Sequence, residues 1–241
     1  MKILSWDIGI KNLSYCLLSN ENNEINILDW DIINLDDPPI ICNGHFKNGN
    51  KCTRKATMIN NTCGYCKTHL KSLDNNKDYK ELKKKKKKIE LLKIGTKLII
   101  ELDKKFKDID DLNEILLENQ PSLKNPTMKS IQMIIYSYFL INYFVPNKIQ
   151  NILMISATQK NKYCNEYAKN NTSIVKPTTK SSYNNAKKLA ILVTKDILEN
   201  GSDNTNFELF KEHKKKDDLA DSYLQGLQYL KKKNDTLIYN Y

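Results

Sequence analysis

The chain of 241 residues is long enough for one core domain with a smaller insert, and an apolar content of 40% is typical of a globular protein. It has no apolar run of about 18 to 20 residues and no N-terminal signal pattern, which excludes a membrane protein and favours an intracellular one. The net charge is +11, with Arg54 the only arginine. An AT-rich genome explains why lysine is used in place of arginine. It does not explain the excess of basic over acidic residues, which favours a nucleic-acid partner.

The first 35 residues have the pattern of three short strands. Apolar residues partly alternate in KILSWDI, NLSYCLL and EINILDWDII, and turn-forming segments separate these runs. The pattern predicts an antiparallel meander. Asp7 lies at the tip of the first strand, before a turn that contains Gly9. A half-buried carboxylate at that place is unfavourable unless another group compensates its charge.

Residues 38–88 lack this periodicity and are expected to form an inserted arm. The segment from Pro38 to His69 combines glycine, asparagine and threonine with four clustered cysteines, and six consecutive lysines follow at 83–88. In an intracellular chain, such a cysteine cluster is more often a metal site than a set of disulfides. The lysine run favours an arm that faces DNA, although a charge run is also typical of a solvated segment.

The cysteine cluster predicts a structural zinc site. Zinc takes four sulfur or nitrogen ligands in tetrahedral geometry, and a small insert buries too little apolar area to fold without a metal. The simplest ligand set is Cys42, Cys52, Cys66 and His69. Cys63 remains an alternative that replaces Cys66 or leaves His69 out.

The second half of the chain alternates between predicted helices and strands. Helices are expected at 89–106, 125–145, 181–201 and 217–233, and strands at 113–121 and 151–158. Gly95 argues against one continuous first helix. The last helix has acids in its first turn and lysines in its last, as the helix dipole favours. This order predicts an α/β fold with a mixed sheet and helices on its faces.

Four acids lie where the predicted elements begin or end. Asp7 and Glu118 end strands, whereas Asp218 and Asp221 open the last helix on one face. Carboxylate oxygens are the ligands that Mg²⁺ prefers, and two ions about 3.5 to 4 Å apart can drive phosphoryl transfer. The pattern predicts a site for two Mg²⁺ or Mn²⁺ ions. In the alternative interpretation, Asp217 and Asp218 are helix-cap acids and Glu118 is a surface acid. Asp7 argues against this interpretation, because Gly9 follows it in a turn directly after a strand that the pattern predicts to be buried.

The segments that contain these acids resemble one enzyme family. WDIGIKNLSYCLL is similar to the first strand and turn of the RNase H-like superfamily. LLENQP, NPTMKSIQMIIYSYF and KKKDDLADSYLQ resemble, in that order, the Holliday junction resolvases of the poxvirus and mitochondrial branch, relatives of RuvC. The resemblance implies an RNase H-like five-stranded mixed sheet flanked by helices, with the zinc-binding insertion as a departure from the family pattern. It also implies a homodimeric, Mg²⁺-dependent endonuclease that nicks branched DNA symmetrically.

The resemblance assigns roles to individual residues. The acids that it implies as catalytic metal ligands are Asp7, Glu118, Asp218 and Asp221, with Asp217 as the alternative to Asp218. The basic residues that it implies as DNA contacts are Lys187 and Lys188, with Lys160 and Lys162 as further candidates. A solvated lysine face explains Lys187 and Lys188 equally well.

The expected function is resolution of four-way junctions by paired nicks in recombination or viral genome processing, in a cytoplasmic virus factory or virion if the protein is viral. One alternative is an RNase H-like nuclease on RNA–DNA hybrids or flaps. Another is a nucleic-acid-binding protein without activity, which the acids oppose because carboxylates beside phosphates weaken binding unless metals neutralise them.

Overall fold

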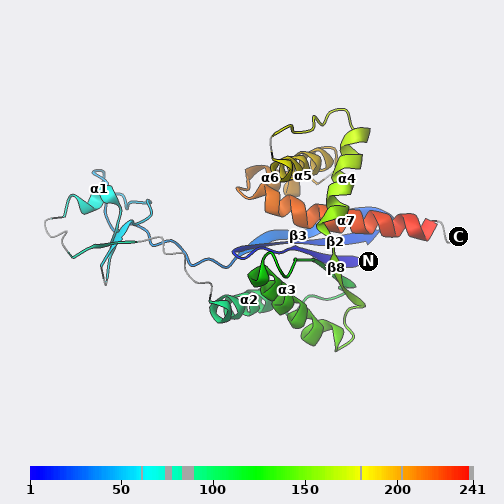
Figure 1. The fold of residues 1–241 in the computed structure, drawn as a ribbon, viewed down its shortest axis with the longest axis horizontal. Helices are drawn as coiled ribbons and strands as arrows, with labels where there is room; N and C mark the ends of the chain where they lie inside the picture. Colours follow the sequence, from blue (N-terminus) through cyan, green and yellow to red (C-terminus); the bar gives the residue numbers. More distant parts are fainter. Residues whose placement is uncertain (61, 74–77, 83–89, 180, 202, 239–241) are drawn as a thin grey trace. The chain divides into compact units, whose positions relative to one another are not determined.

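The computed structural model describes residues 1–60, 62–73, 78–82, 90–179, 181–201 and 203–238. Contacts divide the chain into two compact units (Figure 1). We call residues 1–35 with 90–241 the sheet unit, and residues 36–89 the cysteine module. The insert predicted at 38–88 falls in the cysteine module, and its lysine run at 83–88 lies outside the described residues.

The sheet unit is built on one mixed sheet of five strands. The strand order is β3-β2-β1-β7-β8, with β1 to β3 antiparallel and with β1, β7 and β8 parallel. The strands are β1 (Lys2–Asp7), β2 (Asn12–Glu21), β3 (Glu24–Asn34), β7 (Glu114–Glu118) and β8 (Asn151–Ile155). The predicted meander and the predicted mixed sheet are confirmed.

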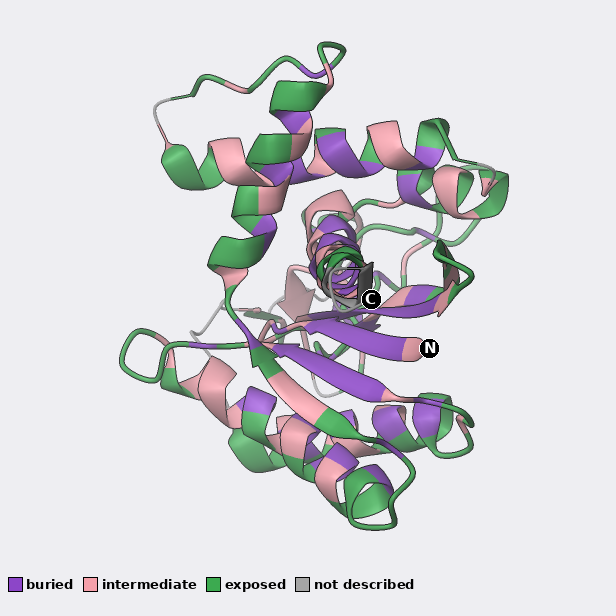
Figure 2. Ribbon diagram, turned by 90° about the vertical axis from the view of Figure 1, so that its right-hand side faces the viewer, coloured by how far each residue is buried: buried purple, intermediate pink, exposed green. Residues whose placement is uncertain are grey.

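Helices cover both faces of this sheet, with α2 and α3 on one face and α4 to α7 on the other (Figures 1 and 2). They are α2 (Leu91–Phe106), α3 (Pro126–Phe139), the π-helix η1 (Leu140–Phe144), α4 (Ala157–Asn170), α5 (Ser182–Glu199), α6 (Asn204–Glu212) and α7 (Lys216–Ile238). One apolar cluster contains Trp6, Leu98 and Phe139, and the other contains Ile3 and Leu224. The sheet is therefore buried on both faces, which fits its apolar central strands.

Several helices differ from the predictions. Helix α2 continues through Gly95, which is buried close to Ile134 of α3, so close packing explains this glycine. The predicted helix 125–145 begins at Pro126 as expected but changes to π-helix at Leu140. Helices α4 and α6 were not predicted, because their polar sequences give little periodic signal.

The last helix is longer than predicted. Helix α7 extends to Ile238, so Lys231 to Lys233 lie inside the helix and its last turn has no basic residue. The expected match between these lysines and the helix dipole is therefore wrong. None of the described helices is both long enough and apolar enough to cross a membrane.

The cysteine module has little regular structure. It contains a three-stranded sheet in the order β5-β4-β6 and one short helix. The elements are β4 (Met58–Ile59), β5 (Gly64–Tyr65), α1 (Lys67–Leu70) and β6 (Lys80–Glu81). Its apolar cluster consists of Cys42, Cys52 and Cys66 with Tyr65 packed against them. So small a core needs a further source of stability.

Candidate active site and metal centre

Asp7 and Glu118 meet at one edge of the large sheet. Asp7 ends β1 and Glu118 ends β7, and the two strands are parallel neighbours, so their carboxyl ends lie side by side. A hydrogen bond joins the two carboxyls. After Asp7 the chain turns at Gly9, where a Cβ atom would overlap the carbonyl oxygen of Asn12. Glycine is thus required for β2 to return beside the acid.

Helix α7 brings the C-terminal acids to the same edge. Trp30 Nε1 donates to the carbonyl oxygen of Leu219 at 3.0 Å, and Gln225 Nε2 donates to Ser5 Oγ at 3.1 Å. Gly226 permits the close approach, because a Cβ atom there would lie 2.6 Å from a side-chain carbon of β2. These contacts fix the first two turns of α7, which contain the predicted acids, at the end of β1 that carries Asp7.

The acids line a pocket of about 650 Å³, to which α4 and α5 add lysines. Lys160 Nζ lies 2.8 Å from Asp221 Oδ1, and Lys187 Nζ lies 2.7 Å from Asp217 Oδ2. The charged residues that line the pocket are Asp7, Lys11, Glu118, Lys160, Lys187, Lys215, Asp217, Asp218 and Asp221. The pocket therefore collects all four acids predicted as metal ligands.

Burial makes these acids difficult to ionise together. Burial raises the pKa of Asp7 well above its ordinary value, and the hydrogen bond to Glu118 and its charge raise that pKa further. Burial and the charges of two neighbouring aspartates raise the pKa of Asp218 to about 6. Burial raises the pKa of Asp221 to about 6 as well, although the Lys160 ammonium opposes the shift. Full ionisation of the cluster requires more positive charge, which a divalent cation can supply.

The two adjacent aspartates of α7 have different partners. Burial opposes ionisation of Asp217, but the hydrogen bond from Lys187 outweighs it and lowers the pKa of Asp217. Lys187 also lies over the ring of Tyr183, 5.3 Å from its centroid. The charge of Asp7 acts on Asp218. Asp217 thus forms an ion pair with Lys187, whereas Asp218 interacts with the other acids of the pocket.

The four predicted DNA-contact lysines occupy different environments. Lys187 and Lys160 both line the pocket, where Lys187 is half-buried and Lys160 is buried against Asp221. Lys162 is exposed and lies 3.8 Å from Glu166. Lys188 is also exposed, and neither Lys162 nor Lys188 lines the acid pocket.

The pocket contains residues that sequence reasoning missed. Lys215 Nζ lies 4.0 Å from Asp218 Oδ2, and the KKKDD run was a signal for it. The backbone N–H of Gln120 donates to Gln132 Oε1 at 3.1 Å, which orders the chain just after Glu118. Tyr183, at the start of α5, had no sequence signal.

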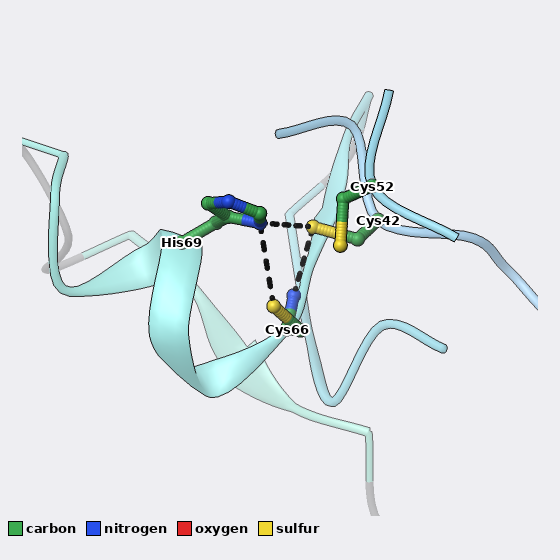
Figure 3. A group of neighbouring side chains, drawn as sticks. All are labelled: Cys42, Cys52, Cys66 and His69. Atoms are coloured by element: carbon green, nitrogen blue, oxygen red, sulfur yellow. Dashed lines mark hydrogen bonds between the residues drawn. The ribbon is translucent and has the colours of Figure 1, made fainter. Parts of the chain in front are cut away.

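The cysteine module brings its four predicted ligands together (Figure 3). Their ligand atoms all lie within 4.8 Å of one another, with His69 Nδ1 3.3 Å from Cys42 Sγ and 3.5 Å from Cys66 Sγ. The backbone N–H groups of Gly44 and Cys66 donate to Cys42 Sγ at 3.4 and 3.3 Å. Such donors stabilise negative charge on a sulfur ligand, and three sulfurs with one imidazole nitrogen fit tetrahedral zinc.

The surroundings of Cys66 favour its thiolate. Burial opposes the thiolate, but hydrogen bonds involving the backbone of His69 and the side chain of Cys42 outweigh burial and lower its pKa to about 6. Cys63, the alternative ligand, is half-buried and lies outside the group of four.

Comparisons with known proteins agree with the fold. The family described as mitochondrial resolvase Ydc2 / RNA splicing MRS1 matches residues 3–212. The chain therefore belongs to the Ydc2/MRS1 family. An uncharacterised Acanthamoeba polyphaga mimivirus protein, L451, is 33% identical over 95% of this chain and 74% of its own length.

Two solved structures are similar to this member of the Ydc2/MRS1 family. The yeast mitochondrial Holliday junction resolvase Ydc2 is 19% identical, with a TM-score of 0.50 over 94% of this chain and 78% of that chain. The fowlpox virus resolvase, solved with Holliday junction DNA, is 18% identical, with a TM-score of 0.49 over 96% of this chain and 98% of that chain. The predicted resemblance to resolvases is thus confirmed at the level of family, and the Ydc2 structure supports the fold.

Proposed function

We propose that this chain is a metal-dependent endonuclease that resolves four-way DNA junctions by paired nicks. The observation that carries the proposal is the convergence of Asp7, Glu118, Asp218 and Asp221 in one pocket, where two lysines pair with aspartates. The family description names both a resolvase and an RNA-splicing protein. The four acids favour the resolvase, since a protein that only binds RNA gains nothing from a carboxylate cluster beside phosphates.

The donor set of the pocket fits Mg²⁺ or Mn²⁺. It consists of carboxylate oxygens from three separate segments, and the raised pKa values of Asp7, Asp218 and Asp221 indicate a deficit of positive charge. We assign two ions to Asp7, Glu118, Asp218 and Asp221. When bound, such ions activate water and neutralise the charge that develops on a scissile phosphate.

Two lysines of the pocket are held in place by aspartates. Lys187 is held by Asp217 at 2.7 Å and by the Tyr183 ring, so its ammonium is kept at the pocket wall, where it can contact a phosphate oxygen. Lys160 is held by Asp221 and compensates the buried acids. We therefore propose that Lys187 contacts the substrate and that Lys160 compensates the charge of the acids. Asp217 then orients Lys187.

The cysteine module holds a structural zinc ion in this proposal. Cys42, Cys52, Cys66 and His69 provide four ligands, and no side chain of the group remains for catalysis. Zinc then supplies the stability that the small core of the module lacks. Chelation is expected to unfold the module while it leaves the sheet unit folded.

The proposal includes a homodimer. A junction is resolved by two symmetrical nicks, and the described residues of one chain contain one pocket with four acids. Two chains therefore supply the two sites. The mimivirus relative favours a role in viral genome processing, in a cytoplasmic virus factory or virion.

The test is a cleavage assay on a mobile four-way junction, a matched linear duplex and an RNA–DNA hybrid, with Mg²⁺, with Mn²⁺ and without added divalent ion. Paired nicks confined to the junction are expected when either ion is present. Cleavage of the hybrid without nicking of the junction would favour the RNase H-like alternative. Junction binding without cleavage under all conditions would favour the non-enzymatic alternative.

A further inference from the structure

The positive charge of the chain is concentrated in the cysteine module. Residues 36–89 contain 14 lysines and arginines and 5 acidic residues, so they account for +9 of the formal net charge of +11. The much longer sheet unit contributes the remaining +2. Phosphate backbones attract cations regardless of base sequence. The charge expected of a nucleic-acid-binding surface is thus in the module, whereas the acid pocket is in the sheet unit.

The described cations of the module are exposed. They are Lys47, Lys51, Arg54, Lys55, Lys67, Lys71 and Lys80. Over the part of the chain that the structure describes, none of these seven forms an ion pair. In the sheet unit, Lys104, Lys195 and Lys211 are equally exposed but pair with acids at helical spacing. The module's cations can therefore exchange counterions for phosphates without breaking an ion pair.

An aromatic ring lies beside one of these cations. Phe46 is 36% exposed, and the guanidinium carbon of Arg54 lies 5.8 Å from its ring centroid. Arg54 Nη1 donates to Thr68 Oγ1 at 3.1 Å, which holds the guanidinium in place. Aromatic rings and guanidinium planes are the surfaces on which unpaired bases stack. Phe46 and Arg54, which we call the stacking platform, thus offer exposed planar groups on which an unpaired base can stack.

The ligand cluster supports this platform directly. The His69 ring meets the Phe46 ring edge-on, with 5.6 Å between centroids, and the backbone N–H of Cys52 donates to the carbonyl oxygen of Gly44 at 2.8 Å. Phe46 itself closes a tight turn, because its backbone N–H donates to the carbonyl oxygen of Asn50 at 2.8 Å. The position of the ring therefore depends on the same residues that would bind zinc.

We propose that the cysteine module is a second DNA-binding site. Its exposed cations take the phosphate backbone of a DNA strand, and Phe46 with Arg54 stacks an unpaired base. The inference rests on the proposed zinc site for the shape of the platform, but it does not require the pocket to cleave DNA. Because both units belong to one chain, a strand bound to the module is available to the pocket at a raised effective concentration.

The cations are tested in the full chain by comparing two triple variants with equal loss of charge. Lys51, Arg54 and Lys55 are changed to Gln in one, and Lys104, Lys195 and Lys211 are changed to Gln in the other. Affinity for a fluorescent single-stranded 20-mer and for an immobile four-way junction is measured by anisotropy over a range of KCl concentrations, without added divalent ion. We expect the module variant to bind about tenfold more weakly or worse at about 150 mM salt, with the log–log salt slope reduced by roughly two for the single strand. The sheet-unit variant is expected to match the wild-type chain.

The stacking platform is tested with Phe46→Leu and Phe46→Tyr. Loss of the aromatic ring is expected to weaken single-strand binding about tenfold while duplex binding stays the same, and Phe46→Tyr is expected to retain wild-type affinity. Zinc content per chain is measured for every variant, so that a loss of affinity at constant zinc reports on the surface and not on folding.

The proposal is overturned if the module variant keeps wild-type affinity and salt slope at constant zinc, or if both triple variants weaken binding equally. Equal effects of Phe46→Leu on single-stranded and duplex DNA would overturn the stacking assignment. Binding does not depend on nicking, so an inactive pocket would contradict the proposed nuclease and leave this test intact.

Discussion

The sheet unit and the cysteine module treat charge in opposite ways. The sheet unit holds the charges of its pocket buried or half-buried and pairs them: Lys160 with Asp221 and Lys187 with Asp217. The module exposes its cations, and its described lysines form no ion pairs with acids. Buried charges require fixed partners because desolvation is costly, whereas exposed charges stay available to a polyanion. The contrast separates a unit suited to chemistry from a unit suited to binding.

The two units also differ in what holds them folded. The sheet unit has two large apolar clusters, one on each face of its sheet. The module has three cysteines and one tyrosine in its cluster. Burial of apolar area can stabilise the first by itself, but the second requires roughly the 10 to 16 kcal/mol that structural zinc contributes to small domains.

The largest expected effect is on cleavage. Asp7→Asn removes a carboxylate charge from the centre of the pocket, and we expect junction nicking to fall on the order of 10³-fold or more. Junction affinity is expected to stay close to that of the wild-type chain, because the module retains its cations. Single-turnover cleavage and anisotropy measure the two properties separately. A variant with full nicking activity would remove Asp7 from the site.

The next-largest expected effect is loss of zinc and of folded structure in the cysteine module alone. Cys52→Ser removes one of the four ligands, and we expect bound zinc to fall from one equivalent to almost none, with loss of amide protection in the module. The sheet unit should keep its protection, since its clusters contain none of these ligands. Metal analysis and hydrogen exchange measure both. Cys63→Ser is the matched control and is expected to keep one equivalent of zinc; loss of zinc from it would show that the ligand set is wrong.

The pocket acids predict a pH dependence of stability. Asp218 and Asp221 have pKa values of about 6 in the folded chain, against about 3.9 for an unfolded aspartate. The folded chain therefore binds more protons than the unfolded chain between about pH 4 and pH 6, and stability falls as pH rises through this window. Above about pH 6 both acids are ionised in the folded chain and the loss of stability is complete. Bound Mg²⁺ is expected to offset this loss.

Thermal unfolding with and without Mg²⁺ from about pH 4.5 to about pH 7.5 measures this effect. The increase in unfolding temperature on addition of Mg²⁺ should be larger at the higher pH. Asp218→Asn serves as the control, because it removes one titrating acid. The unfolding temperature of this variant should fall less steeply as pH rises. If the unfolding temperature falls equally steeply with pH in the wild-type chain and in Asp218→Asn, the effect does not come from the pocket.

The smallest effects separate lysines inside and outside the pocket. Lys187→Gln is expected to slow nicking roughly 10- to 100-fold, because it removes a phosphate contact at the reacting site. Lys162→Gln and Lys188→Gln are expected to change it less than about twofold, since both side chains are exposed and lie outside the pocket lining. Single-turnover rates at saturating junction decide between them, and a large effect of Lys188→Gln would place the substrate on a different face of α5.

Much of the architecture was predictable because it depends on local pattern. The three N-terminal strands, the strand that ends at Glu118 and the start of α3 at Pro126 follow from alternation, turn residues and proline. Helices α4 and α6 were missed because few of their residues are apolar, so the narrow apolar faces that they bury give a weak periodic signal.

The order of residues already shows which residue types are available for the two sites, since strand-end acids and clustered cysteines are visible in it. The partners of these residues follow from the three-dimensional fold. It paired Lys160 with Asp221 and Lys187 with Asp217, and it left Cys63 outside the ligand group. These outcomes depend on distances between segments far apart in the chain, set by the packing of α4, α5 and α7 on the sheet. Local patterns contain no measure of such distances.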